Sequence, residues 1–531
     1  MKFTTIKTYI AAALVSASLF SCSEDTMDRI NEDIDNPHDV EAKFILTDVI
    51  TSTAFSNIGG DFNHYFSTYV ENEAGIYNQF YTVEHRGGET YASSTFDNDW
   101  TNAYSTLKNA RIIVDKCSEN GSEPGKYTTK GIGEVLAALN AGLITDAWGD
   151  TPYSQAALPN LDNGKPAYMN PQIDKQESIY KDIIAQLDAA IEDLQKEDKD
   201  GPGSQDILFK GDKDKWLKLA YGLKARYTMH TLNVTSDKAA ALKTVIDCCA
   251  KAAQSASEQA AFGEGIYDGN TNLNPLYDFF TSREYLAASH SLAKKLMDYK
   301  DPRTYCAFVS ALDPKADYTG KQLNLDEEKE PLAMMAPNGE VEQAQEYYNT
   351  SIFLFASTAP TFLMSYHEVK FLEAEAYQRS GDNDKALAAL KEAVKAGLEN
   401  VNRSITSALN SGMVVEGTHP SITTDDINAY LTEVENRFNA NPLKEIMVQK
   451  YFAFWGANGE STECYNDVRR LKAEGHFDYY GFENPANAKD KFPLRAPYGA
   501  SGVSGNPNVK AAYGNGQYVF TEPVWWAGGK K

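Results

Sequence analysis

Apolar residues recur at steps of three and four positions over several long stretches of this chain, and this pattern limits its fold more than any other feature. Four such stripes stand out, and the first begins at Trp100, which we expect in the core. The stripes are Trp100, Tyr104, Leu107, Arg111, Val114 and Cys117; Val135, Leu139 and Leu143; Ile183, Ile184, Leu187, Ile191 and Leu194; and Trp216, Leu219, Ala220, Leu223 and Tyr227. This spacing places the apolar side chains on one face of an α-helix. The sequence therefore predicts a mainly α-helical protein.

The stretches between these stripes have a different composition. Residues 196–212, 263–283, 312–350 and 475–531 are rich in Gly, Pro, Asn, Asp and aromatic residues and show no period. We expect long loops there that cover the helical frame. Asp174, with Glu177 three residues later, is a predicted N-terminal cap for the third stripe.

One segment indicates a particular kind of helix pair. Small residues at Ala374, Ala376, Ala386 and Ala393, with Tyr377 and Gly381 among them, have the spacing at which tetratricopeptide helices pack closely. Lys370 departs from this pattern, and no second copy is evident. A tetratricopeptide-type pair is our prediction, and a generic helical hairpin is the alternative.

The first 22 residues have the order of a bacterial lipoprotein signal. Lys2 and Lys7 precede an apolar stretch from Tyr9 to Phe20, and Leu19-Phe20-Ser21-Cys22 forms a lipobox. We therefore predict residues 1–21 as a signal peptide and Cys22 as the lipidated residue, which tethers the protein to a membrane surface. The alternatives are an ordinary secretory signal with a chance cysteine, or a short buried helix.

The residues after Cys22 are acidic. Residues 22–35 read as a solvated tether, and residues 36–531 as a single domain. The acidic run resembles the export signal that sends some lipoproteins to the outer face of the outer membrane, although simple linker solubility explains it as well. No later segment reaches the about 18 apolar residues of a membrane helix, so we expect lipid to be the only anchor. The net charge of −24 disfavours nucleic acid and anionic lipid as partners.

The search for catalytic and metal-binding motifs favours a binding protein. The five cysteines other than Cys22 are an odd number, and neither they nor the eight histidines have the spacing of a metal site. No nucleophile, nucleotide or calcium motif is present. Asp146 and Asp150 are a possible glycosidase pair, but their setting indicates a helix end followed by a turn that Asp150 caps. We predict no enzyme activity, no cofactor and no metal.

Several segments taken together resemble one family. They are Asp146 to Tyr153 (DAWGDTPY), Lys210 to Arg226, Tyr366 to Tyr377, Asp467 to Arg470, and Asn506 to Trp526. In this order, behind a lipobox, they resemble the SusD/RagB family, especially its SusD-like branch. Two segments depart from the family pattern: Cys464-Tyr465-Asn466 stands where relatives often have a Trp, and Lys491 to Tyr498 is looser than usual.

The resemblance implies a SusD-like helical fold, built on tetratricopeptide-type helix pairs with long loop-rich insertions. It also implies a nutrient-binding lipoprotein on the cell surface that captures oligosaccharides for a SusC-like TonB-dependent transporter of the outer membrane. The RagB type captures peptides instead. Arg469 and Arg470 are expected against carboxylates or helix ends, and Trp525 and Trp526 are expected to seal the core.

Aromatic and amide residues mark the predicted ligand site. Sugar rings pack on aromatic planes while their hydroxyls bind polar side chains. The densest such mixture outside a clear helix lies between residues 77 and 99, and a second lies at 279–285. The predicted ligand-binding residues are Tyr77, Tyr81, Arg86, Tyr91, Arg283 and Tyr285.

Three classes of function remain open from the sequence. Glycan capture is the first, peptide capture by the same machinery is the second, and a surface glycoside hydrolase or a bare tetratricopeptide scaffold is the third. The lack of a recognisable acid and base pair disfavours the hydrolase. The long loops disfavour a scaffold, whose repeats would be continuous.

Overall fold

The computed structural model describes residues 40–87, 95–159, 161–162, 165–312, 319–327, 331–516 and 518–530. Residues from Ala42 onward form one unit with its own core, and Met1–Glu41 form a separate one. The predicted signal, tether and lipidation at Cys22 lie outside the described residues. Within the described part, no helix has the length and apolar character needed to cross a membrane.

Helices dominate the fold, which confirms the mainly α prediction. Their bounds are α3 Ala42–Thr51, α4 Asp61–Tyr69, α5 Asn78–Glu84, α6 Asp97–Cys117, α7 Tyr127–Trp148, α8 Gln176–Asp193, α9 Lys213–His230, α10 Lys238–Cys249, α11 Pro275–Arg283, α12 His290–Asp298, α13 Tyr366–Arg379, α14 Asn383–Asn410, α15 Thr424–Ala440, α16 Pro442–Ala453, α17 Ser461–Ala473, α18 Ala500–Gly505, α19 Pro507–Tyr513 and α20 Tyr518–Thr521. A π-helix, η2 (Ser52–Ile58), joins α3 to α4.

The strands are short and form small sheets at the edges of the helical frame. Their bounds are β1 Glu73–Gly75, β2 Thr151–Pro152, β3 Leu161–Asp162, β4 Lys165–Pro166, β5 Ile173–Asp174, β6 Ala260–Phe262, β7 Leu286–Ala288, β8 Phe308–Val309, β9 Gly320–Leu323, β10 Thr350–Ser351, β11 Thr361–Met364 and β12 Val414–Val415. The order β10-β8-β9-β12 gives a four-stranded sheet, and β1-β7, β11-β6, β2-β5 and β3-β4 are pairs. The pair β1-β7 connects the two predicted ligand segments.

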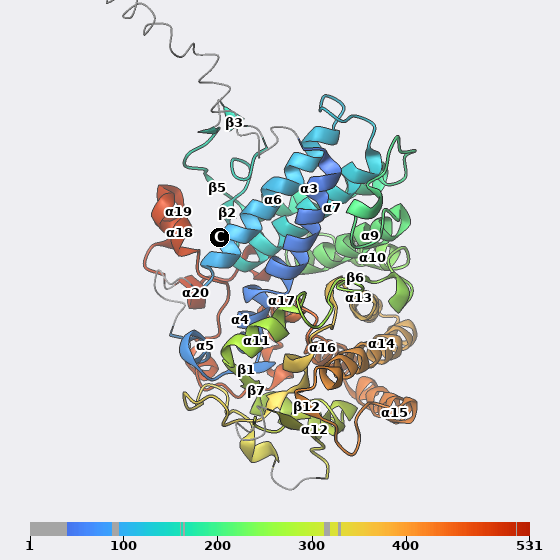
Figure 1. Ribbon diagram of the computed structural model, residues 1–531, viewed down its shortest axis with the longest axis vertical. Coiled ribbons are helices and arrows are strands. Elements are labelled where there is room, and N and C mark those ends of the chain that lie inside the picture. Colours follow the sequence, from blue (N-terminus) through green and yellow to red (C-terminus); the bar gives the residue numbers. More distant parts are fainter. Residues whose placement is uncertain are drawn as a thin grey trace, which may run out of the picture. The chain divides into compact units, whose positions relative to one another are not determined.

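The frame is a succession of helices in which each contacts the next. This holds from α6 through α7, α8, α9 and α10, and then from α13 through α14, α15 and α16. Figure 1 shows α3, α6 and α7 side by side in the blue and cyan part of the chain. The predicted hairpin is the pair α13 and α14, with Gly381 at a φ of +87° in the turn between them and Ala374, Ala386 and Ala393 buried. The sequence indicated this one helical hairpin, whereas the structure shows further contacts between consecutive helices.

Helix α7 is buried on every side over its last two thirds, because its small residues allow neighbouring helices to approach closely. A Cβ atom at Gly142 would lie 2.1 Å from the Tyr227 hydroxyl of α9, and one at Gly133 would lie 2.8 Å from Ile113 of α6. Such distances are inside van der Waals contact, so any larger residue at these crossings would displace the Tyr227 or Ile113 side chain.

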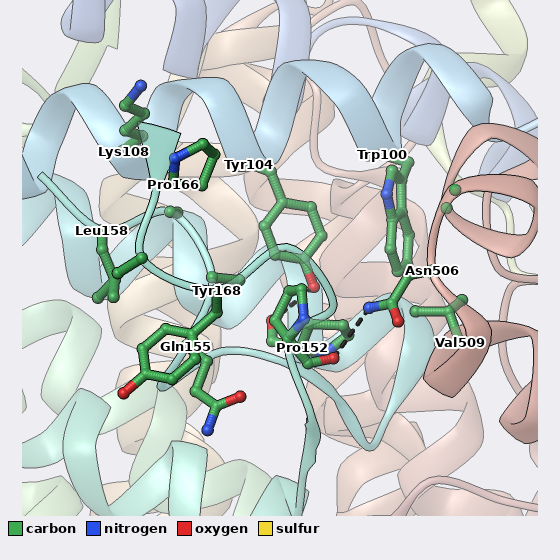
Figure 2. A pocket seen from close by; sticks show the side chains of 16 residues that line it. Trp100, Tyr104, Lys108, Pro152, Gln155, Leu158, Pro166, Tyr168, Asn506 and Val509 are labelled. Atoms are coloured by element: carbon green, nitrogen blue, oxygen red, sulfur yellow. Dashed lines mark hydrogen bonds between the residues drawn. The ribbon is translucent and has the colours of Figure 1, made fainter. Parts of the chain in front are cut away.

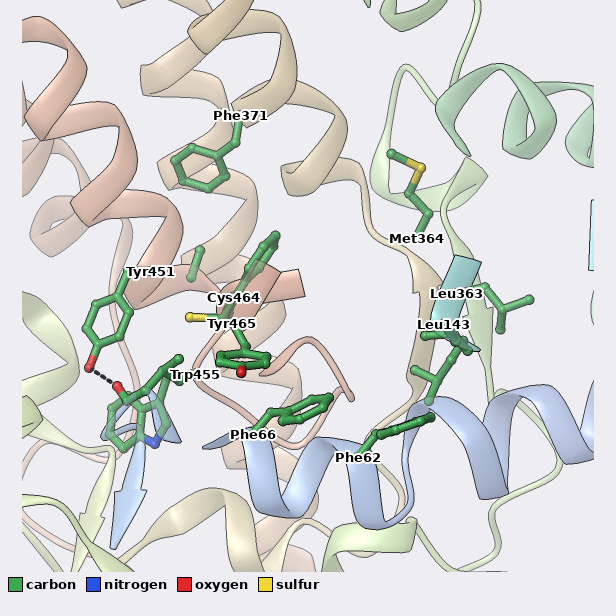
Figure 3. Packing of buried hydrophobic residues seen from close by; sticks show 14 of the residues in the cluster. Phe62, Phe66, Leu143, Leu363, Met364, Phe371, Tyr451, Trp455, Cys464 and Tyr465 are labelled. Atoms are coloured by element: carbon green, nitrogen blue, oxygen red, sulfur yellow. Dashed lines mark hydrogen bonds between the residues drawn. The ribbon is translucent and has the colours of Figure 1, made fainter. Parts of the chain in front are cut away.

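Aromatic side chains from distant parts of the sequence pack together in the core (Figure 3). The Phe66 ring of α4 stacks on the Tyr465 ring of α17, with centroids 4.6 Å apart. The Tyr451 hydroxyl of α16 donates a hydrogen bond of 2.9 Å to the Val70 carbonyl. The core therefore joins the first and last thirds of the chain.

The predicted positions of Arg470 and Trp526 are confirmed, whereas Trp525 is only half-buried and Arg469 has a different environment. Trp526 is fully buried and donates from Nε1 to Asp146 Oδ1 at 2.9 Å. Arg470 is held by both carboxylate oxygens of Glu375, at 2.6 and 2.7 Å. Arg469 lies between the rings of Tyr465 and Trp526 rather than on a carboxylate.

Several local predictions need correction. Residues 475–531 contain α18, α19 and α20, and residues 263–283 contain α11. These helices are too short to show an apolar period, and α11 and α19 begin with Asn and Pro, which also favour turns. The buried face of α6 runs through Ala103, Ala110 and Ile113 beside Trp100, Leu107 and Cys117, so Arg111 and Val114 are only half-buried.

The predicted cap of α8 is also wrong. Asp174 accepts hydrogen bonds from the backbone of Tyr153 and Ser154. The start of α8 is instead bound by Asp150, whose Oδ1 accepts from the Gln176 N–H at 2.9 Å. Asp150 therefore caps the start of α8, although it lies 26 residues before Gln176 in the chain, so this role could be seen only in the folded structure.

Candidate functional site

The two predicted ligand segments meet at one place on the surface. Strand β1 pairs with β7, with Gly75 opposite Leu286, and the Ile76 N–H donates to the Tyr285 carbonyl at 2.9 Å. This pairing brings the half-buried Tyr77 and Tyr285 rings to a centroid distance of 5.6 Å. We call these two residues the aromatic ledge.

A polar pocket of about 280 Å³ adjoins the ledge. Side chains of α4, α5, α6 and α11 form it, and they include Asp61, His64, Gln79, Asn98, Asp99, Asn102, Asp278, Phe279 and Arg283. Phe279 links the pocket to the ledge, because its ring centroid lies 4.5 Å from His64 and 6.1 Å from Tyr285. The pocket offers amides, carboxylates, a guanidinium and a ring within one small hollow, which suits a ligand with many hydroxyl groups.

Two carboxylates of this pocket titrate in opposite directions. For Asp61, burial would raise the pKa, but the neighbouring His64 and Asn98 outweigh it and the pKa is lowered. For Asp99, burial and the Asp61 charge raise the pKa well above its ordinary value. Around neutral pH, Asp61 is therefore an acceptor, and Asp99 is shifted toward its protonated form.

Some polar atoms at the floor of the pocket have no hydrogen-bond partner. They are Asp99 Oδ2 and both ring nitrogens of His64, on side chains that are almost completely buried. Buried polar atoms are nearly always paired in folded proteins. These atoms are an exception, and they lie on buried side chains at the floor of the hollow.

Two other predicted ligand residues, Tyr81 and Arg86, do not line this pocket. Arg86 is only 2% exposed, and its guanidinium donates to the Val83 and Tyr69 carbonyls at 3.1 and 3.5 Å. Its positive charge therefore stabilises the end of α5 and does not face a ligand, which corrects the prediction. Tyr81 lies in α5 with its ring tilted against that of His85, at a centroid distance of 4.2 Å, and Tyr91 lies outside the described residues.

The expectation that residues 77–91 lack helical structure is also corrected, because Asn78–Glu84 form α5. Sequence reasoning missed Asp61 and His64, which line the pocket from α4. Their spacing of three residues at the start of a helix was the available signal. It carries little weight without knowledge of what α4 packs against.

A second hollow, of about 310 Å³, lies along α6 and is mostly apolar (Figure 2). Trp100, Tyr104 and Lys108 line it at steps of four residues, opposite Tyr168 and Val509. Trp100 is 9% exposed and belongs to the core, as expected. The Tyr104 hydroxyl already donates to the Pro152 carbonyl, and the Asn506 amide donates to the Pro171 carbonyl. Since two of its polar side chains are engaged and its lining is mostly apolar, this apolar pocket is a poorer match for a hydroxyl-rich ligand.

Among the described residues, Asp146, His230 and Glu463 form a cluster that has metal-ligand geometry. All three are buried, and His230 Nε2 lies 3.0 Å from Glu463 Oε2. Burial would lower the pKa of His230, but Glu463 and Asp146 outweigh it and raise the pKa to about 9. The protonated histidine pairs with both carboxylates, and Arg226 lies 3.8 Å from Glu463, so the cluster is an internal ion-pair network. Asp146 is enclosed in this network and Asp150 binds the start of α8, which disfavours these two residues as a glycosidase pair.

Taken together, these features define a class: a helical protein in which α4, α5, α6 and α11 form a polar surface pocket beside aromatic rings. A family model described as "starch-binding associating with outer membrane" matches residues 36–474. The chain belongs to the SusD/RagB family of nutrient-binding, outer-membrane-associated proteins. The predicted family is thereby confirmed.

Solved structures agree with this assignment. A SusD/RagB family protein from Bacteroides thetaiotaomicron VPI-5482 is 48% identical, with a TM-score of 0.86, over 93% of this chain and 100% of that one. A chitin-binding protein is 21% identical, with a TM-score of 0.65, over 91% and 99% of the two chains. A SusD homologue from Bacteroides fragilis NCTC 9343 is 18% identical, with a TM-score of 0.64, over 92% and 100%. The last two are similar in fold alone. No curated protein matches the chain.

Proposed function

We propose that this protein captures oligosaccharides at the cell surface and delivers them to a SusC-like TonB-dependent transporter of the outer membrane. In this proposal the lipid on Cys22 holds the protein at the membrane, and residues from Ala42 onward bind the ligand. The tether raises the effective concentration of the two partners, so a modest affinity between them suffices. Family membership supports the general role, and the surface site supports the class of ligand.

The observation that carries the proposal is the contact between the aromatic ledge and the polar pocket. A sugar ring has an apolar C–H face and a rim of hydroxyls, so it needs a flat ring beside hydrogen-bonding groups. Tyr77 and Tyr285 supply the rings, while Gln79 and Arg283 are exposed at the pocket next to them. The family description and the chitin-binding relative are consistent with carbohydrate as the ligand.

The opposite pKa shifts of Asp61 and Asp99 resemble those of a glycoside hydrolase, which pairs an ionised carboxylate with a protonated one. Asp99 is 1% exposed, and its Oδ1 accepts from the Phe62 N–H at 3.0 Å. Its carboxyl group is thus enclosed beneath the pocket and out of reach of a glycosidic oxygen. We therefore propose binding without cleavage, and an assay for new reducing ends in the bound glycans tests this point.

The test of ligand binding is calorimetric titration with a panel of soluble glycans and short peptides. Tyr77→Ala and Tyr285→Ala should each weaken glycan binding by about tenfold to a hundredfold, as expected for loss of roughly 1–3 kcal/mol of ring contact. Tyr168→Ala is the matched control, since this tyrosine is 48% exposed but lies at the apolar pocket. Peptide binding at the same residues would favour the RagB-like alternative.

The test of partnership is mild detergent extraction followed by pull-down. A TonB-dependent barrel should be recovered in near-equal amount with the lipoprotein. Recovery of the lipoprotein alone, under several mild conditions, would contradict delivery to a transporter while leaving ligand capture intact.

A further inference from the structure

A third hollow lies beyond the aromatic ledge and has no part in the site described so far. It encloses about 640 Å³, more than twice the volume of the polar pocket. Its walls include His290, Met335, Glu342, Tyr347 and Tyr348. Tyr347 is 55% exposed, the highest exposure of any tyrosine among the large apolar side chains that the structure describes. A large ring in water above a hollow is a feature of a binding surface.

The Tyr347 ring is held in a defined position. It makes an edge contact with Tyr348, with centroids 4.8 Å apart and planes at 89°. Tyr348 is itself buried, and its hydroxyl accepts a hydrogen bond from the Glu342 N–H at 3.0 Å. An exposed ring supported in this way loses little freedom when a ligand covers it.

The hollow and the aromatic ledge are both connected to one small hydrophobic cluster. This cluster is separate from the main core. It contains Ala74 of β1, the adjoining Ile76, Ala287 of β7, and Val341 and Tyr348 from the segment 341–348. The predicted ligand residue Tyr81 packs against this cluster from α5. The cluster therefore fixes the segment 341–348 relative to the strands that position Tyr77 and Tyr285.

A direct contact connects the hollow to the polar pocket. Gln345 donates from Nε2 to the Arg283 carbonyl at 2.6 Å. The side chain of Arg283 lines the polar pocket, and Gln345 lies two residues before Tyr347. A surface path thus runs from the polar pocket, past residues 283–285, to Tyr347.

We propose that the hollow at Tyr347 is a second ligand subsite, so that the protein binds an extended oligosaccharide spanning both ends of this path. The inference rests on the proposed function and deepens it by specifying the length of the ligand. Tyr347 provides a ring platform as the ledge does. The His290 and Glu483 side chains, paired at 2.7 Å, provide hydrogen-bonding groups near it. A disaccharide fills the first site alone, whereas a longer oligomer gains contacts at the second.

The experiment compares oligosaccharide lengths in the full-length protein. Wild type, Tyr347→Ala and Tyr77→Ala are titrated with disaccharide and heptasaccharide members of the malto and chito series, and Tyr168→Ala is the control of similar exposure. Tyr347→Ala should weaken heptasaccharide binding by about tenfold and change disaccharide binding by less than about twofold. Tyr77→Ala should weaken both. Thermal melts should be unchanged for Tyr347→Ala, because its ring is largely in solvent.

Three results would overturn the inference. The first is equal wild-type affinity for short and long members of a series that binds. The second is that Tyr347→Ala keeps the wild-type heptasaccharide affinity while Tyr77→Ala loses affinity. That result would contradict the second subsite but leave the proposed function supported. The third is reduced recovery of the transporter with Tyr347→Ala at unchanged glycan affinity, which would make the hollow a protein interface. Absence of binding to every glycan in wild type would remove the proposed function and this inference together.

Discussion

Replacing Glu375 by Gln should destabilise this protein more than any other single carboxylate change that we consider. Glu375 of α13 and Arg470 of α17 are both fully buried and share two hydrogen bonds of 2.6 and 2.7 Å. Arg379 also donates to Glu375 at 2.7 Å. The substitution removes one negative charge between two guanidinium groups and leaves Arg470 with Asp467 at 2.9 Å as its nearest carboxylate.

The size of the effect follows from burial. Removing one partner of a buried ion pair costs about 3–5 kcal/mol, since the other charge stays buried without compensation. The remaining contact with Asp467 reduces this to roughly 2–4 kcal/mol. With an unfolding entropy of about 2.1 cal/mol/K per residue, a unit of this length should lose only about 2–4 °C in Tm. Differential scanning calorimetry resolves such a shift.

The control is Glu373→Gln on the same helix. Glu373 is partly exposed and pairs with Lys370 at 2.8 Å, so its loss should cost less than about 1 kcal/mol. The double variant of Glu375→Gln with Arg470→Met should recover part of the loss, because no charge is then left unpaired.

The pH dependence of the Tm difference between wild type and Glu375→Gln gives a second test. Burial would raise the pKa of Glu375, but Arg470 and Arg379 outweigh it and hold the pKa well below its usual range. A lowered pKa contributes stability that is fully present above about pH 4.5 and is lost as the pH falls. The Tm difference between wild type and Glu375→Gln should therefore shrink in acid. A difference no larger than that of Glu373→Gln, or one that is constant down to the lowest measurable pH, would refute the reasoning.

Three further predictions concern other parts of the molecule. Burial alone would lower the pKa of His230, but two neighbouring carboxylates outweigh it and raise the pKa to about 9. The stability that the protonated imidazole contributes is therefore complete below about pH 6.5 and is lost as the pH rises towards 9. Thermal melts should show this loss in wild type and not in His230→Gln. Gly142→Ala should cost about 1–3 kcal/mol in denaturant titrations, because its Cβ would overlap the Tyr227 hydroxyl, whereas Gly505→Ala meets no atom within 4 Å and should be neutral. Cys22→Ala should release the protein from membranes in cell fractionation, and membrane-bound lipidated protein in that variant would contradict the lipobox.

The helices and the family could be predicted from the sequence, because both depend on patterns that are local along the chain. The stripe from Trp216 to Tyr227 is buried in α9 as its spacing requires. The small residues from Ala374 to Ala393 form a close hairpin, since close packing needs only the absence of large side chains on each helix. The lipobox and acidic tether remain predictions that the described residues do not test.

The ligand site depended on the tertiary structure, because its parts are far apart in the chain. Aromatic content directed attention to two segments whose role in ligand binding stays a prediction, and the pairing of β1 with β7 places Tyr77 against Tyr285. Composition did not separate Arg86 from Arg283. The first is enclosed by backbone carbonyls and the second is exposed at the polar pocket, and this difference arises from what packs around each residue.

The same reason explains the roles of the buried charges. The sequence predicts that Arg470 of α17 needs a carboxylate partner. Which carboxylate binds it, Glu375, is decided only when α13 and α17 pack together. Helix periodicity is a property of neighbouring residues and can be read along the chain. Pocket shape, charge pairing and exposure are properties of contacts between distant residues, and only the folded structure determines them.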